Sequence, residues 1–129
     1  MSVLLSVRGM GVRIGAASPV DSVSFDVNAA EMLGIVGESG SGKSLTMRAL
    51  LQLLPAHAST TGQALWQGRD LLAMTGGDIR RMRGRQVAMI YQEPMTALDP
   101  VLPIGRQITE SLNVHLGLRG GACPCHATA

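Results

Sequence analysis

Apolar positions near the start of the sequence follow the patterns of β-strands. Residues 2–7 and 12–14 are short apolar stretches, and residues 20–27 place Val23, Phe25 and Val27 in alternation with polar side chains. Alternation with a period of two is typical of a strand that buries one face. We therefore predict that the chain begins with several short strands of an antiparallel kind.

Two later apolar runs lack this alternation. Residues 32–36 and residues 87–91 are apolar almost throughout, and each leads into a segment rich in glycine or proline. A short apolar run without alternation is typical of a strand that is covered on both faces, as in a parallel sheet. We predict that both runs are buried strands.

Helical spacing of apolar residues appears in three places. It predicts a helix over residues 45–54, which a proline ends, and another over residues 104–116. A shorter helix is predicted over residues 78–83, because Thr75 and Asp78 have the spacing of a capping box. Between these helices we predict a loop over residues 57–61, a strand over residues 62–67, and a turn around Gly68 that leads to residues 70–72.

The composition is that of one globular domain. The 129 residues are 46% hydrophobic and 16% charged, with a formal net charge of +2. This balance argues against a disordered chain and gives no field for binding nucleic acid. No apolar run approaches the roughly 20 residues of a membrane span, and the first residues lack the apolar core of an export signal. We therefore expect a cytoplasmic protein.

The cysteines give no framework for the fold. Cys123 and Cys125 both lie close to the end of the sequence, so no disulfide is expected to span the domain. Together with His126 they lack the fourth ligand and the usual spacing of a zinc site, and we predict no metal site there.

Residues 37–44 read Gly-Glu-Ser-Gly-Ser-Gly-Lys-Ser and match a phosphate-binding loop at every required position. Glycines at 37, 40 and 42 let the backbone approach a polyphosphate closely, and the following helix adds the positive end of its dipole. Lys43, the only lysine of the sequence, can reach the β- and γ-phosphates, and the Ser44 hydroxyl can bind Mg²⁺. A flexible turn that matches by chance is the alternative, and the predicted flanking strand and helix argue against it.

Two stretches carry a family resemblance. GESGSGKS at residues 37–44 and MIYQEPMTALDPVLPIGRQI at residues 89–108 resemble the ATP-binding subunits of ABC transporters. The similarity is to the branch that imports dipeptides, oligopeptides and nickel, and it extends over residues 4–117. It implies an α/β fold of the P-loop NTPase class, present in incomplete form as an antiparallel β subdomain and the start of the P-loop core. Residues 1–117 are thus interpreted as the amino-terminal part of an ATP-binding domain and residues 118–129 as an irregular tail.

The resemblance also implies a site and its ligands. Gln92 corresponds to the glutamine of the Q-loop, whose amide can reach Mg²⁺ or the attacking water. The implied cofactors are ATP and Mg²⁺, with Ser44 and Gln92 as the metal-binding residues. The predicted nucleotide-binding residues are Gly37, Glu38, Ser39, Gly40, Ser41, Gly42, Lys43, Ser44, Leu45 and Gln92.

The sequence departs from the family pattern in several places. Ile14 stands near the position of the family's adenine-stacking aromatic residue, which predicts weaker nucleotide binding. The usual Pro-Gly-Glu turn is replaced by Ala29, Ala30 and Glu31. The larger departure is that no signature sequence, no Walker B aspartate with its catalytic glutamate and no switch histidine is found. Neither His57, His115 nor His126 falls where that histidine would stand.

Two weaker features have ordinary explanations. Residues 74–78, Met-Thr-Gly-Gly-Asp, imitate the family signature but stand before Gln92 rather than after it, and we interpret them as a helix cap. The arginines that follow can touch phosphate or an acidic partner, but a solvated helix face is the favoured interpretation; they are Arg80, Arg81, Arg83 and Arg85.

The leading hypothesis is an ATP-binding component of a peptide importer that binds but does not hydrolyse ATP in this form. Its implied partners are transmembrane permease subunits, a second ATP-binding subunit and, indirectly, an extracytoplasmic solute-binding protein. Its implied location is the inner face of the cell membrane. A small P-loop kinase and a non-catalytic remnant remain as alternatives. Because an uncovered apolar strand favours aggregation, we also expect low solubility of the isolated chain.

Overall fold

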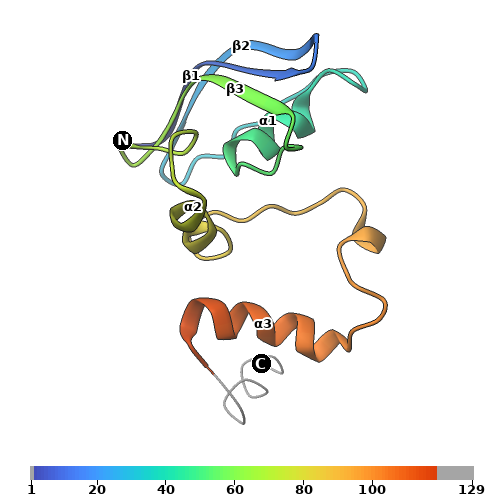
Figure 1. Cartoon of the computed structure of the whole chain (residues 1–129). Helices are drawn as coiled ribbons and strands as arrows, with labels where there is room; N and C mark the ends of the chain where they lie inside the picture. The colour runs from blue at the N-terminus through green and yellow to red at the C-terminus, as the bar shows by residue number, and fades with distance from the viewer. Residues whose placement is uncertain (1, 119–129) are drawn as a thin grey trace. The chain divides into compact units, whose positions relative to one another are not determined.

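The computed structural model describes residues 2–118, and Figure 1 shows their helices and strands. The chain divides between Arg80 and Arg81 into two compact units, which are described in turn. The predicted tail with Cys123, Cys125 and His126 lies outside the described residues, apart from Leu118.

The first unit is built on one antiparallel sheet. Its strands are β1 (Val3–Ile14), β2 (Ala17–Asn28), β3 (Ala58–Trp66) and β4 (Arg69–Asp70), in the order β2-β1-β3-β4. Residues 2–7 and 12–14 thus belong to one long strand with an irregular register between Val7 and Val12. The predicted antiparallel character of this region is confirmed.

The predicted loop over residues 57–61 is wrong. Strand β3 already begins at Ala58, and Ser59, Thr60 and Thr61 pair with the second half of β1. Serine and threonine are ambiguous in sequence, but β1 offers a free edge with unpaired backbone groups, and pairing there satisfies them.

The core of this unit lies between the sheet and α1 (Lys43–Leu50). Val7, Met10 and Val12 of β1 are each 0% exposed, and α1 buries Thr46, Ala49 and Leu50. These helix positions lie three and four residues apart and so share one face. The packing holds the beginning of α1, and the loop before it, against the sheet.

Helix α1 is shorter than predicted. It begins at Lys43 and ends at Leu50, whereas the sequence pattern predicts 45–54. Gln52 ends it early by adopting a left-handed conformation with φ of 52°. The Gln52 Nε2 donates hydrogen bonds to the carbonyl oxygens of Leu71 at 2.7 Å and Met74 at 3.0 Å, which ties the end of α1 to the segment after β4.

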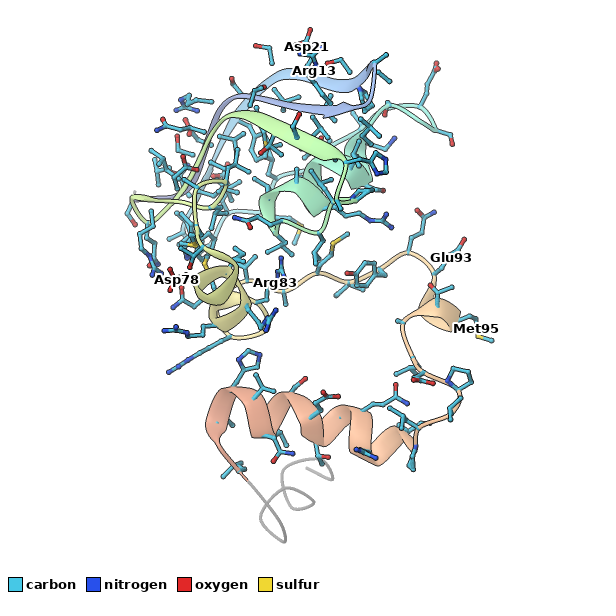
Figure 2. The ribbon with its side chains drawn as sticks, in the orientation of Figure 1. Arg13, Asp21, Asp78, Arg83, Glu93 and Met95 are labelled. Carbon is cyan, nitrogen blue, oxygen red and sulfur yellow. The ribbon has the colours of Figure 1, made fainter. Side chains whose placement is uncertain are left out.

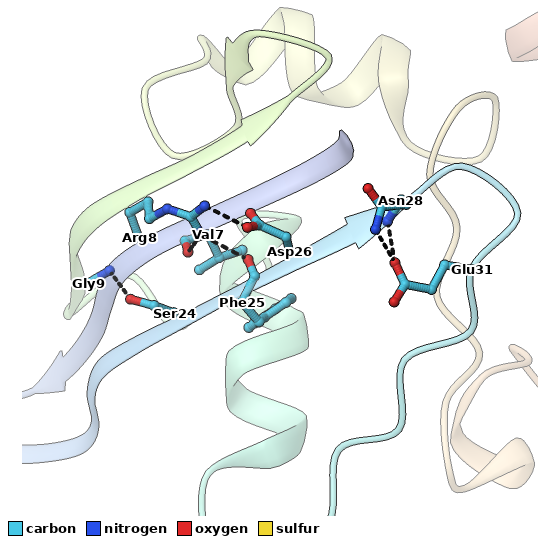
Figure 3. A network of polar contacts seen from close by, with 8 residues as sticks. All are labelled: Val7, Arg8, Gly9, Ser24, Phe25, Asp26, Asn28 and Glu31. Carbon is cyan, nitrogen blue, oxygen red and sulfur yellow. Dashed lines mark hydrogen bonds and ion pairs between the residues drawn. The ribbon is translucent and has the colours of Figure 1, made fainter. Parts of the chain in front are cut away.

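The face of the sheet opposite α1 carries a polar network (Figure 3). The Arg8 Nη2 donates to Asp26 Oδ2 at 2.6 Å across the β1–β2 pair, and the Gly9 N–H donates to Ser24 Oγ at 2.8 Å. The hydrogen bond and charge of Arg8 hold the pKa of the Asp26 carboxyl below its usual value. This face is therefore polar and partly exposed, as a half-buried antiparallel sheet requires.

Strand β2 is followed by a closed turn. Glu31 Oε2 accepts hydrogen bonds from the Asn28 backbone N–H at 2.6 Å and from Asn28 Nδ2 at 2.8 Å (Figure 3). Ala30 has φ of 60°, a conformation that glycine adopts with less strain. The replacement of the family's Pro-Gly-Glu turn thus retains the glutamate that closes it.

The prediction of a buried strand over residues 32–36 is wrong. These residues form no strand, and Met32 and Val36 are 97% and 95% exposed. Their backbone N–H and carbonyl groups form no hydrogen bond with any described residue. A strand of a parallel sheet needs a neighbouring strand and two covering layers, and the described part of the chain supplies neither to this run.

The second predicted buried strand, residues 87–91, is also wrong. Ile90 is 97% exposed and Tyr91 is 43% exposed, and the only ladder contact of this run among the described residues is a single bridge from Val87 to Arg83. Here too the run is apolar but has no strand beside it.

The helices after β4 agree with the sequence patterns. Helix α2 covers Gly76–Met82 and crosses the division between the units, and α3 covers Ile104–Leu116, as predicted. The Thr75 hydroxyl accepts a hydrogen bond from the Asp78 N–H at 3.3 Å and donates one to Asp78 Oδ2 at 2.7 Å. This confirms the helix-cap interpretation of residues 74–78. Arg80, Arg81 and Arg85 are exposed, as a solvated face requires, whereas Arg83 is half-buried and interacts with other residues of the chain.

None of the helices in the part of the chain that the structure describes is long and apolar enough to span a membrane.

Candidate phosphate-binding site

The glycine-rich loop leads directly into α1. Gly42 occupies the N-cap position with φ of 85°, and Gly40 has φ of 79°. Side chains are disfavoured at such angles, and a Cβ at Gly42 would also lie 2.8 Å from the Pro19 carbonyl oxygen of β2. Glycine is therefore required at position 42 both for the bend and for the close approach of the loop to the sheet.

The beginning of α1 is anchored behind this bend. The carbonyl oxygen of Gly42 accepts hydrogen bonds from the Thr46 N–H and from Thr46 Oγ1, both at 2.8 Å. Thr46 is 5% exposed, so its hydroxyl would be costly to bury without this partner. The sequence analysis did not single out Thr46 or Gln52; nothing in the motif marks the first, and a left-handed glutamine leaves no signal in a sequence.

The loop leaves a group of backbone donors unused. The Ser41 N–H bonds to the Glu38 carbonyl oxygen at 3.2 Å, but the N–H groups of residues 39, 40 and 42–45 have no acceptor among the described residues. The first N–H groups of any helix lack partners within the helix and carry its partial positive charge. Such an arrangement is suited to an anion, and the residues that carry these donors are exposed or half-buried in the first unit.

Lys43 supplies the only full positive charge in the motif. Its Nζ donates to the carbonyl oxygens of Gly37 at 2.7 Å and Glu38 at 2.6 Å, and to Ser41 Oγ at 3.0 Å. All three ammonium hydrogens are therefore held by the loop itself. A phosphate group that enters the loop would meet the ammonium already at the site.

The residues present fit one part of a magnesium site. The Ser44 side chain is exposed in the first turn of α1, and its hydroxyl makes no hydrogen bond with any described residue. A free hydroxyl is a suitable single protein ligand for Mg²⁺, which keeps most of its other positions for water and phosphate oxygens. Among residues 2–118, no group of three or more histidine, cysteine, aspartate or glutamate side chains that could hold a metal ion occurs.

Gln92 lies in the second unit. It is exposed, on the irregular segment between residues 87–91 and the short 3₁₀ turn Pro94–Thr96. Figure 2 shows the neighbouring Glu93 and Met95 side chains projecting from this segment, and Met95 is 89% exposed. The pairing of Gln92 with the phosphate-binding loop stays a prediction. Ile14 is half-buried at the end of β1, paired with Ala17 and Ala58.

Residues 20–117 match the family model described as ABC transporter. Among similar proteins, the oligopeptide transport ATP-binding protein OppD of Haemophilus influenzae is 41% identical over 121 residues, which are 91% of this chain and 38% of that protein. The peptidoglycan transport ATP-binding protein YejF of Agrobacterium fabrum is 46% identical over 123 residues, 91% of this chain and 22% of that protein. A putative peptide import ATP-binding protein of Brucella abortus is 45% identical over 122 residues, with 37% of its length covered. The chain thus spans between about a fifth and two fifths of the length of these relatives.

Proposed function

The chain belongs to the ABC transporter family, and we propose that it binds the triphosphate of ATP, with Mg²⁺, through residues 37–45. The observation that carries this proposal is the loop itself. A lysine ammonium is held over the loop, beside a row of backbone N–H groups that have no acceptor among residues 2–118. The family match also supports the P-loop NTPase class of the fold.

Each residue of the loop has a role in this proposal. The N–H groups of residues 39, 40 and 42–45 would surround the β-phosphate, and Lys43 would neutralise the β- and γ-phosphates. Ser44 would hold Mg²⁺, which supplies charge neutralisation between the phosphates when bound. By the resemblance to the family's Q-loop glutamine, the Gln92 amide would be a further ligand for Mg²⁺.

The proposal for this chain alone is binding without hydrolysis. Hydrolysis of a phosphoanhydride needs a residue that orients the attacking water, and it needs a carboxylate near the metal ion. The sequence has no apolar run followed by Asp-Glu, and Glu38 of the loop is exposed and forms no hydrogen bond with the Ser44 hydroxyl.

The names of the relatives suggest the wider setting. They describe ATP-binding proteins for the transport of oligopeptides, peptides and peptidoglycan. We propose that this chain is the amino-terminal part of such a subunit, acting at the inner face of the cell membrane with permease subunits and a second ATP-binding subunit. A small P-loop kinase is disfavoured, because the family match covers residues 20–117.

Calorimetric titration with ATP, with and without Mg²⁺, tests the proposal. The wild type should bind ATP, and Lys43→Ala should weaken binding at least tenfold because the only ammonium in the loop is lost. Arg48→Ala, which removes a cation from the exposed side of the same helix, serves as the control and should bind like the wild type.

Absence of binding by wild-type protein with a native circular dichroism spectrum would refute the proposal and leave the non-catalytic remnant. Turnover of ATP that Lys43→Ala abolishes would refute the claim of binding without hydrolysis. Transfer of labelled phosphate to a small acceptor would favour the kinase.

A further inference from the structure

The three acceptors of the Lys43 ammonium differ in kind. Two are backbone carbonyl oxygens, those of Gly37 and Glu38, which any sequence with this backbone would provide. The third is the side-chain hydroxyl of Ser41 at 3.0 Å. Ser41 is therefore the one partner of Lys43 that depends on the choice of side chain.

The loop leaves room for this hydroxyl. The Ser41 backbone is held by the hydrogen bond from its N–H to the Glu38 carbonyl oxygen at 3.2 Å. A Cβ at Gly37 would lie 2.7 Å from Ser41 Oγ and 3.4 Å from Ser41 Cβ, too close for the hydroxyl to keep its place. Glycine at position 37, whose φ is not in the left-handed region, thus leaves room for the Ser41 side chain.

Another serine of the loop, Ser39, behaves differently. Ser39 is also exposed, but its hydroxyl forms no hydrogen bond with any residue that the structure describes. The two serines lie two residues apart in the same loop, so the contact of Ser41 with Lys43 does not follow from composition alone.

We propose that Ser41 is a positioning residue, whose hydroxyl holds the Lys43 ammonium over the empty loop before a nucleotide arrives. This inference rests on the proposed function, because holding the ammonium in place serves nucleotide binding. Its test without nucleotide does not depend on that function. Lysine has a long, flexible stem, and ordering it during binding costs conformational entropy that is avoided when the stem is already ordered. A hydroxyl that accepts from an ammonium is also polarised, so its own hydrogen becomes a stronger donor toward a phosphate oxygen.

The chain offers an unusually direct test, because Lys43 is its only lysine. Acetylation by an N-hydroxysuccinimide ester can be followed at this side chain by peptide mass spectrometry, with the α-amino group as internal reference. The ammonium must leave its acceptors and lose a proton to solvent before the neutral amine can attack the ester, so loss of one acceptor should raise the acetylation rate. The matched variants are Ser41→Thr and Ser41→Val, which have nearly the same shape and differ in the hydroxyl.

We expect Ser41→Thr to react like the wild type and Ser41→Val to react at least threefold faster in the absence of nucleotide. Ser39→Ala should match the wild type, and Gly37→Ala should react faster because it displaces the Ser41 hydroxyl. With ATP and Mg²⁺, Ser41→Val should need several times more nucleotide than Ser41→Thr for half-maximal protection of Lys43.

Equal rates for Ser41→Thr and Ser41→Val in the empty protein would overturn the inference. If Ser41→Val does not fold by circular dichroism, Ser41→Ala against the wild type makes the same comparison. If ATP does not protect Lys43 in the wild type, the proposed function fails, while the contrast between the Thr and Val variants still decides the role of Ser41.

Discussion

Strand β1 and residues 32–36 are both strongly apolar, yet they have opposite environments. Val7, Met10 and Val12 of β1 are each 0% exposed, whereas Met32 is 97% exposed. Strand β1 has a hydrogen-bonded neighbour on each side and α1 against one face, but residues 32–36 have no strand beside them within the described chain. An apolar run can thus be buried, but it is buried only where neighbouring strands and helices cover it.

The largest expected effect comes from making the same substitution in each region. Met10→Ala should lower the free energy of unfolding by about 2–5 kcal/mol, because it leaves a cavity in the core between the sheet and α1. Met32→Ala should change it by no more than about 0.5 kcal/mol, since the side chain is already in water. Urea denaturation followed by circular dichroism measures both. Equal losses for the two variants would mean that residues 32–36 are buried in solution.

The same contrast explains how much of the fold the sequence predicts. Alternation in residues 20–27 and helical spacing in residues 104–116 are local signals, and the structure has a strand and a helix there. The lack of alternation in residues 32–36 and 87–91 predicts a place in a parallel sheet, which depends on residues far away in the sequence. Neither run is a strand of such a sheet among residues 2–118, although the apolar pattern that predicts one is present.

The candidate site divides in the same way. The phosphate-binding loop, its glycines and Lys43 follow from the spacing of one motif, because phosphate binding requires those residue types in that order. Three contacts depend instead on backbone angles and on the sheet. They are the hydrogen bond from Lys43 to Ser41, the hydrogen bond from the Gln52 side chain to the Leu71 carbonyl oxygen, and the close approach of Gly42 to Pro19. A sequence pattern does not specify these contacts, since the same residues occur in loops of other shapes.

A second prediction concerns the exposed runs as sites of association. Ile90→Lys should slow aggregation of the isolated chain several-fold, because it places a charge among residues 88–91, whose backbone groups form no hydrogen bond with a described residue and can pair with another chain. Val114→Lys is the matched control, since Val114 is 64% exposed but lies in α3, where the backbone is already hydrogen-bonded. Light scattering at fixed protein concentration measures the rate.

An equal improvement from Ile90→Lys and Val114→Lys would show that net charge, and not the unpaired run, controls solubility. A wild-type chain that stays monomeric and melts cooperatively would contradict the expected low solubility altogether.

The smallest expected effect lies on the polar face of the sheet, where Arg8 and Asp26 join β1 to β2 at 2.6 Å. Because the pKa of Asp26 is lowered in the folded protein, its carboxylate stabilises the fold at pH values above its unfolded pKa. That stabilisation is lost as the pH falls through the lower, folded pKa. The difference in unfolding free energy between the wild type and Asp26→Asn should therefore be present at pH 7 and shrink below about pH 4, the range in which an unperturbed aspartate titrates. It should also shrink at high salt, since the pair is exposed to solvent. Asp21→Asn controls for net charge, because it removes a β2 carboxylate that has no ion pair with a described residue (Figure 2). If the difference in unfolding free energy between the wild type and Asp26→Asn stays constant from pH 7 to pH 2, Asp26 acts through its shape alone.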